Sequence, residues 1–216
     1  MRIHQVSLRF SESYLIEVEQ GLILVDAGLP GSENQILKEI KQLQFSDLKI
    51  IFITHAHLDH YGSAAAIRNL TGAKIAIHSA DAAVMSKGET HLGIPKGRGK
   101  IVSPLMPLLE KIYPPARVRA DILLDDGDRL QIGGIVCKVV HTPGHTSGSC
   151  TYLFNERFAF VGDLLSNNGG PHVQKYFAQD WSLISSSVQT LKSYNPQWAY
   201  AGHGKKPINQ ADLQKL

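Results

Sequence analysis

The sequence has little cysteine, little excess charge and no long apolar run. Two cysteines among 216 residues make a disulfide framework unlikely to be the basis of the fold and favour a reducing compartment. A formal net charge of +3 gives no reason to expect nucleic-acid binding. No apolar run approaches the roughly 18 residues that span a bilayer, and the first residues do not resemble a secretion signal. We therefore expect a cytoplasmic protein with no membrane span and no nucleic-acid partner.

The composition and the pattern of apolar residues predict a single α/β domain over residues 1–216. Hydrophobic residues make up 43% of the chain and charged residues 19%, as in globular proteins with one sizeable core. Apolar and alternating runs predict strands at 3–10, 14–18, 22–25, 48–53, 74–77, 121–124, 129–132, 135–141, 151–154, 158–162 and 198–201. Helical spacing predicts helices after Ser32, whose hydroxyl is a candidate cap, and at 61–70, 181–193 and 209–216. Ser11-Glu12-Ser13 is expected to form the first hairpin turn.

Four potential metal ligands lie within six residues, directly after the predicted strand 48–53. They are His55, His57, Asp59 and His60. Three imidazoles and a carboxylate at a strand end add polar groups that must be solvated or paired, and they contribute almost nothing to a core. Nitrogen and oxygen ligands of this kind suit zinc and related divalent metals. The segment therefore predicts a metal site.

Three later segments also place a histidine or an aspartate in a turn after a predicted strand. They carry His145, Asp163 and His203. Each segment alone is weak evidence, because a lone histidine in a loop is more often a surface residue than a ligand. Strand ends in a layered α/β fold can converge on one edge of a sheet. The shared placement therefore predicts that these side chains join the first four.

Together with Asp26, at the end of strand 22–25, these segments resemble the metallo-β-lactamase-fold hydrolases over essentially the whole chain. The motif His-x-His-x-Asp-His stands intact at 55–60. The resemblance implies a four-layer αβ/βα sandwich of two mixed sheets flanked by helices, with two divalent metal ions. Zinc is the expected metal, and iron and manganese are alternatives. The implied ligands of the first metal are His55, His57 and His145. Those of the second are Asp59, His60 and His203, with Asp163 bridging the two.

The resemblance also implies roles in catalysis. A hydroxide bridging two metals about 3.5–4 Å apart would attack the substrate, and Asp59 would accept its proton and return it to the leaving group. Asp26 would orient a ligand histidine, or else it simply closes the turn at Gly28. Three further side chains are candidates for substrate contact, although the first could equally pack under a helix: Tyr61, His172 and Tyr176.

Residues 87–119 differ in composition from the rest of the chain. They hold five of the ten prolines, and seven basic against two acidic residues give them a net charge of +5. An apolar run broken by prolines lies at 101–109. This segment is interpreted as a surface insertion, as a lid over a pocket that suits an acyl chain or an anionic thioester, or as a homodimer contact.

The expected function is hydrolysis of a small ester, thioester or lactone, as in glyoxalase-II-like and acyl-homoserine-lactonase-like members. The chain ends 13 residues after His203, so the helical glutathione-binding domain of glyoxalase II is not expected. A dedicated β-lactamase is disfavoured because Asp163 stands where some carry cysteine, although promiscuous β-lactam hydrolysis stays open. The alternatives are a persulfide-dioxygenase-like oxidoreductase with one iron and a non-catalytic binding protein, which the intact ligand set disfavours.

Overall fold

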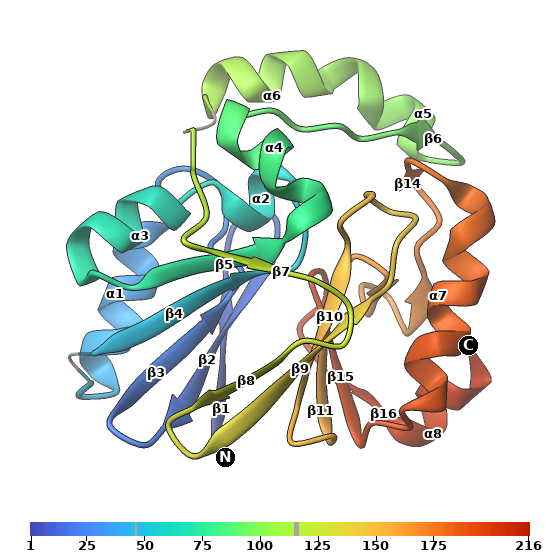
Figure 1. Ribbon diagram of the computed structural model, residues 1–216. Helices are drawn as coiled ribbons and strands as arrows, with labels where there is room; N and C mark the ends of the chain where they lie inside the picture. Colours follow the sequence, from blue (N-terminus) through green and yellow to red (C-terminus); the bar gives the residue numbers. More distant parts are fainter. Residues whose placement is uncertain (46, 115–116) are drawn as a thin grey trace.

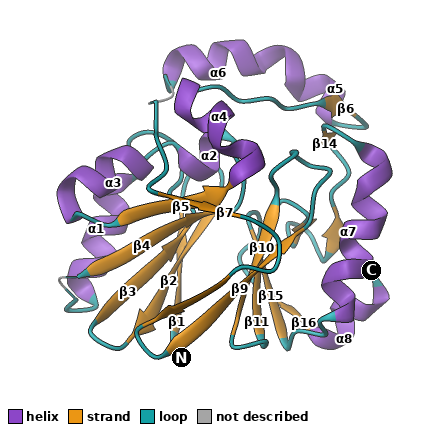
Figure 2. Ribbon diagram, viewed as in Figure 1, coloured by secondary structure: helices purple, strands orange, loops and turns teal. Residues whose placement is uncertain are grey.

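Two six-stranded sheets pack face to face, and helices cover their outer faces (Figure 1). The structure is a computed structural model that describes residues 1–45, 47–114 and 117–216. Figure 2 shows the strands gathered in the middle of the molecule with the helices outside them. The predicted α/β class and the αβ/βα sandwich are confirmed.

The first sheet is antiparallel at its N-terminal end and parallel beyond it. Its strands, in spatial order, are β1 (Ile3–Ser7), β2 (Glu12–Val18), β3 (Gly21–Val25), β4 (Leu48–Ile53), β5 (Lys74–His78) and β7 (Ile122–Leu124). The pairs from β3 to β7 are parallel. The helices that connect or follow the strands of this sheet are α1 (Glu33–Gln42), α2 (Leu58–Tyr61), α3 (Ala64–Thr71) and α4 (Ser79–Lys87).

The second sheet contains one parallel pair among antiparallel neighbours. Its order is β16 (Ile208–Asn209), β15 (Trp198–Ala201), β11 (Phe158–Gly162), β10 (Cys150–Phe154), β9 (Ile135–His141) and β8 (Arg129–Ile132), with β11 and β15 parallel. Helices α7 (Trp181–Ser193) and α8 (Gln210–Lys215) lie on its outer side. Two small ribbons pair β12 (Leu165–Ser166) with β13 (His172–Val173), and β14 (Phe177–Ala178) with β6 (Ile94–Pro95).

A buried aromatic and aliphatic core joins the two sheets. Phe52 of β4 packs against Tyr152 and Phe154 of β10, with ring centroids 4.6 and 5.9 Å away. Tyr14 of β2 meets Phe160 of β11 at 5.2 Å. Since side chains on a strand alternate between faces, the opposite faces of both sheets pack against the helices in two further clusters.

Two buried tyrosines tie each sheet to a strand end of the other. The Tyr152 hydroxyl donates to the carbonyl oxygen of Ile53, the last residue of β4, at 2.7 Å. The Tyr14 hydroxyl donates to the carbonyl oxygen of Ala201, the last residue of β15, at 2.7 Å. Both strands end two residues before a predicted metal ligand. The cross-sheet bonds therefore fix the points from which the ligand loops depart.

Local boundaries differ from the sequence-based predictions near the N-terminus. The first strand ends at Ser7, and the turn lies at residues 8–11, where the Leu8 N–H donates to the Ser11 carbonyl at 3.0 Å. The predicted turn at Ser11-Glu12-Ser13 is wrong because these polar residues are buried as β2 begins. The predicted cap at Ser32 is also wrong: α1 does begin at Glu33, but the Ser32 hydroxyl makes no capping hydrogen bond.

The helix predicted at 61–70 is two helices, and it begins earlier. Helix α2 begins at Leu58, directly within the histidine segment, and α3 follows from Ala64. Gly62 lies between them, where a Cβ atom would stand 2.4 Å from Pro30 Cδ. Because the chain passes so close to Pro30, only glycine fits there without a shift. Asp59 and His60 therefore lie on a short helix rather than in a loop.

The segment 87–119 contains a helical stretch at 99–112 despite its prolines. It forms α5 (Gly99–Val102), a 3₁₀ turn η1 (Ser103–Leu105) and α6 (Met106–Ile112). Pro104 and Pro107 occupy the first turns of η1 and α6, where proline lacks no hydrogen bond that the helix needs. These helices lie above both sheets (Figure 1). No helix in the described part of the chain is long and apolar enough to cross a membrane.

Replacing Tyr152 with phenylalanine should destabilise the metal-free protein. The buried carbonyl of Ile53 would lose its cross-sheet donor, so we expect the free energy of unfolding to fall by about 1–2 kcal/mol. Chemical denaturation followed by circular dichroism measures the change. Tyr200→Phe is the matched control, because the Tyr200 ring also packs in this core, on Phe160, but is only partly buried. An equal loss in both variants would contradict the role of the cross-sheet bond.

Candidate metal centre

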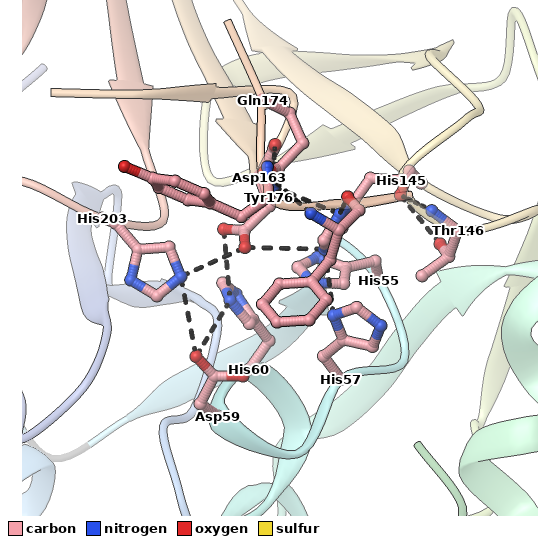
Figure 3. Close-up of polar contacts among 12 residues, drawn as sticks. His55, His57, Asp59, His60, His145, Thr146, Asp163, Gln174, Tyr176 and His203 are labelled. Carbon is pink, nitrogen blue, oxygen red and sulfur yellow. Dashed lines mark hydrogen bonds and ion pairs between the residues drawn. The ribbon is translucent and has the colours of Figure 1, made fainter. Parts of the chain in front are cut away.

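All seven predicted ligands lie together at one edge of the sandwich (Figure 3). His55 and His57 follow β4, and Asp59 and His60 lie on α2. The other three come from the turns that follow β9, β11 and β15: His145, Asp163 and His203. Four chain segments that are distant in sequence therefore converge, because the strands that precede them end at the same edge.

The first group of side chains is His55, His57 and His145. All three are buried, with exposed fractions of 1–3%, and ligand atoms of the group lie within 4.8 Å of one another. His57 Nδ1 and His145 Nε2 are only 2.9 Å apart. Burial lowers the pKa of each imidazole, that of His145 to about 3. The rings are therefore neutral at neutral pH, which is the state that binds a metal ion.

The second group is Asp59, His60 and His203, whose ligand atoms also lie within 4.8 Å of one another. Asp59 Oδ2 lies 3.6 Å from Nε2 of both histidines. Asp163 stands between the groups: its Oδ1 lies 3.4 Å from His60 Nε2, and its Oδ2 lies 3.1 Å from His203 Nε2 and 3.5 Å from His145 Nε2. One carboxylate therefore touches histidines of both groups.

The second group has the opposite electrostatic character to the first. Burial would lower the pKa of His60, but the carboxylates of Asp59, Asp26 and Asp163 outweigh it and raise that pKa well above its ordinary value. His203 behaves alike, and Asp163 raises its pKa to about 9 against burial. In return, the two histidines outweigh burial and hold the pKa of Asp163 well below its usual range. The histidines of this group are protonated at neutral pH, and a bound cation could take the place of those protons.

Unpaired atoms at the cluster fit a bound cation. Six buried side-chain atoms in the described residues have no hydrogen-bond partner, and three of them belong to this cluster: His55 Nε2, His60 Nε2 and Asp163 Oδ1. Buried polar atoms are rarely left unpaired in proteins. Nitrogen and carboxylate oxygen donors are those that zinc and similar divalent ions take. The residues present therefore fit divalent metal ions.

Each ligand histidine is held from behind by its other ring nitrogen. His145 Nδ1 lies 2.9 Å from the Phe177 carbonyl, and His203 Nδ1 lies 2.8 Å from the Phe10 carbonyl. His57 uses Nε2 toward the His91 carbonyl at 3.2 Å, and His55 Nδ1 meets the Thr54 hydroxyl at 3.0 Å. Such partners fix ring orientation and tautomer at metal sites. Of the nitrogens that face the cluster, those of His55 and His60 have no hydrogen-bond partner, and the others contact groups within the cluster.

Asp26 lies behind His60. Its Oδ2 is 2.8 Å from His60 Nδ1, and its Oδ1 accepts the backbone N–H of Thr54 at 2.8 Å. Its backbone is left-handed, with φ of +58°, a conformation that costs energy in residues other than glycine. The carboxylate thus holds His60 and the end of β4 in place, and its orientation of a metal ligand stays a prediction.

Asp81, on α4, was not predicted from the sequence, and it joins the two loops of the first group. Its Oδ2 accepts the Ala56 N–H at 2.7 Å and the Thr146 hydroxyl at 2.8 Å. Its Oδ1 accepts the Gly148 N–H at 2.7 Å. The side chain is 1% exposed. One signal was available, an aspartate directly after the strand ending at His78, but nothing in the sequence links it to residues far along the chain.

Gln174 is a second residue that the sequence did not reveal. Its Nε2 donates to the Asp163 carbonyl at 3.1 Å, and its Oε1 accepts the N–H groups of Lys175 and Tyr176 at 2.9 Å. The amide therefore fastens the loop after β13 to the turn that carries Asp163.

A cavity of about 250 Å³ lies over the cluster. Its floor is formed by ligand side chains, among them His57, Asp59 and His203, and its walls are mostly apolar. The wall residues that carry this character are Phe10, Leu29, Leu92, Val102, Met106, Leu109, Tyr113 and Phe177. Most of these come from the segment 87–119. No lysine or arginine occurs among the described residues that line the cavity.

The three predicted substrate-contact residues are not among those that line this cavity. Tyr61 is fully buried, its hydroxyl donates to the Glu89 carbonyl at 3.0 Å, and burial raises its pKa to about 12. It packs under α2 and α3, as the alternative interpretation had it. His172 Nδ1 lies 2.8 Å from the Gly170 carbonyl. Tyr176 does not line the cavity, but the following residue, Phe177, forms part of its wall.

Comparison with known proteins finds matches over nearly the whole chain. The model of the metallo-beta-lactamase superfamily matches residues 6–203. The uncharacterized protein YobT of Bacillus subtilis is 30% identical over 204 residues, which cover 89% of this chain and 82% of YobT. Hydroxyacylglutathione hydrolase GloC of Haemophilus influenzae is 25% identical, over 89% of this chain and 84% of its own.

A solved structure agrees with the sequence matches. The class B3 di-zinc metallo-beta-lactamase LRA-12 from an Alaskan soil metagenome superposes with a TM-score of 0.68 at 28% identity. The superposition covers 93% of this chain and 75% of that one.

The Asp81→Asn substitution should weaken metal binding at the first group. The amide would present an NH₂ group to N–H or O–H donors that now share two carboxylate oxygens, so the His57 and His145 loops would no longer be held together. We expect a roughly tenfold loss of zinc affinity, as for other residues that support metal ligands, measured by competition with a chelating dye. Asp121→Asn is the control, since Asp121 accepts the Ile75 N–H far from the cluster. Equal losses in both variants would argue against the prediction.

Metal uptake should release protons from the second group and not from the first. His203, with its pKa raised to about 9, is protonated at neutral pH and must lose that proton to coordinate a metal. Affinity at this group should therefore rise with pH until His203 is neutral, whereas the first group, neutral already, should change little. Calorimetric titration with zinc in buffers of different ionisation enthalpy gives the protons released per ion. Equal release for both ions would refute this difference.

Proposed function

The chain belongs to the metallo-beta-lactamase superfamily, and from that premise we propose that it is a two-metal hydrolase that cleaves an ester, thioester or lactone carrying an apolar acyl group. The observation that carries the proposal is Asp163, whose two oxygens approach histidines of two separate ligand groups. A carboxylate in this place suits a shared ligand of two ions.

The proposed ligands follow the two groups. His55, His57 and His145 would hold one ion, Asp59, His60 and His203 the other, and Asp163 both. Zinc is the metal we propose, because the donors are imidazole and carboxylate and the similar LRA-12 is named a di-zinc enzyme. Bound in this way, divalent ions supply Lewis acidity, which activates water at neutral pH and polarises a substrate carbonyl group.

The chain's own residues then position the reaction. Asp59 is the proposed proton carrier: its Oδ2 faces the cluster between His60 and His203, and the side chain lines the cavity above. With one carboxylate oxygen on the ion, the other can take a proton and pass it to the leaving group. Asp26 keeps His60 in one tautomer through Nδ1, so that Nε2 stays available to a ligand.

The cavity walls support an apolar acyl group on the substrate. Val102, Met106 and Leu109 line the space above the ligands, whereas the basic residues of the segment 87–119 are absent from the described lining. Of the two substrate types considered for this segment, the acyl chain therefore has more support than the anionic thioester. The likeness to hydroxyacylglutathione hydrolase GloC supports hydrolysis of an acyl compound without identifying the leaving group.

A screen of substrates with metal analysis in parallel tests this proposal. Esters, thioesters and lactones of increasing acyl length, a β-lactam and a persulfide would be offered to protein of measured zinc and iron content. We expect two zinc ions per chain and a kcat/KM that rises with acyl length until the cavity is filled. His57→Ala and Asp163→Ala should each lower kcat/KM at least a hundredfold, and Lys192→Ala, on the outer helix α7, should not.

Two results would overturn the proposal. One iron per chain with oxygen consumption on a persulfide would favour the oxidoreductase alternative. Full hydrolytic activity in the His57→Ala and Asp163→Ala variants would remove the site assignment. Rapid turnover of the β-lactam with none of the acyl esters would replace the substrate class but keep the metal centre.

A further inference from the structure

The helical segment 99–112, formed by α5, η1 and α6, is apolar on two opposite faces. Its inner face places Val102, Met106 and Leu109 in the cavity wall. Its outer face exposes four large side chains at helical spacing: Ile101, Leu105, Leu108 and Ile112, exposed by 75%, 55%, 57% and 58%. We call these four residues the outer stripe. Figure 1 shows the segment at the rim of the molecule, with its outer side away from both sheets.

Helices that are apolar all round are normally buried on all sides. The inner face of this segment borders the cavity, where Met106 and Leu109 are partly buried and Val102 is 41% exposed. Among the described residues, nothing covers the outer stripe, and clustered apolar side chains in water usually mark a surface that binds something. We therefore expect the outer stripe to bind a molecule or surface other than this chain.

The charges around the stripe are positive. Arg98 and Lys100 precede or begin the segment, and Lys111 lies at its other end, while the ammonium of Lys96, further upstream, lies 4.3 Å from the centroid of the Trp181 ring. Glu110, the acidic residue of this segment, lines the cavity instead. The outer face thus combines an apolar stripe with cationic ends, which is the pattern of helices that lie in the interface of an anionic bilayer.

A second copy of the chain is a poorer occupant. Twofold symmetry would match the stripe with itself by placing Ile101 on Ile112 and Leu105 on Leu108 of the copy. That arrangement also brings Lys100 beside Lys111 of the copy, and juxtaposed like charges oppose association.

We propose that the outer stripe docks the enzyme on the surface of a bilayer that contains anionic phospholipids. The four aliphatic side chains enter the boundary between headgroups and acyl chains, and the flanking lysines and Arg98 contact anionic headgroups. This is binding at a surface and involves no membrane span. It goes beyond the proposed reaction and does not depend on it.

Co-sedimentation of the full chain, loaded with zinc, with vesicles tests the proposal. Phosphatidylcholine vesicles with and without phosphatidylglycerol would be compared at low and high salt. We expect binding to the anionic vesicles only, weakened by salt. The Leu105→Gln/Leu108→Gln and Lys100→Glu/Lys111→Glu variants should each bind at least tenfold more weakly. Matched controls on other helices are Leu70→Gln, at a leucine 65% exposed on α3, and Lys38→Glu/Lys41→Glu on α1.

Thermal unfolding and size-exclusion chromatography with light scattering complete the test. The substituted residues are exposed, so all variants should unfold at the temperature of the unmodified protein. The proposal is overturned if the unmodified protein ignores anionic vesicles or if the stripe variant binds them as tightly as the Leu70→Gln control does. It is overturned equally if the unmodified protein is a dimer that the stripe variant converts to a monomer. Loss of hydrolysis in the substrate screen, by contrast, would leave this docking result unaffected.

Discussion

The structure depends on holding five imidazoles and two carboxylates together at one buried edge. The imidazoles of His55, His57 and His145 are neutral and crowded together, which leaves buried polar atoms without partners. Asp163 is ionised and favours the protonated form of the histidines next to it. Packing alone gives such a cluster no reason to form. The cluster is maintained because each histidine contacts a protein group through the ring nitrogen that faces away from the cluster. In addition, the core between the sheets fixes the strands that precede these residues.

The core and the metal centre are linked through strand ends. Tyr152 and Tyr14 reach across the sandwich to the last carbonyls of β4 and β15, and the ligand loops depart from there. Asp26 and Asp81 then connect loops that packing does not join, each through several short hydrogen bonds. The side chains that orient the clustered histidines thus also close the fold around the site.

The helices α5 and α6 serve two environments. Their inner face narrows the space above the ligands to an apolar cavity, which favours acyl groups over charged ones. Their outer face and lysines suit a lipid surface. Taken together, the two proposals place the enzyme on the bilayer surface, where an apolar substrate that dissolves poorly in water would be concentrated. Segment 87–119, which stands out by composition, is then the part that adapts a common metal centre to a particular class of substrate.

Sequence by itself determined the class of fold, the two sheets and the His and Asp residues that gather at one edge, because strand periodicity and clustered His and Asp residues are local patterns. It missed the early start of α2, the turn at residues 8–11 and the helices within the proline-rich segment, since close approaches such as Gly62 to Pro30 involve distant residues. Only the tertiary structure decided that Asp81 and Gln174 support the site, that Tyr61 lies in the core, and that the described lysines of 87–119 do not line the cavity. The physical reason is that a carboxylate's partners, unlike its own place in a strand or helix, are set by which loops the packed sheets bring within hydrogen-bonding distance.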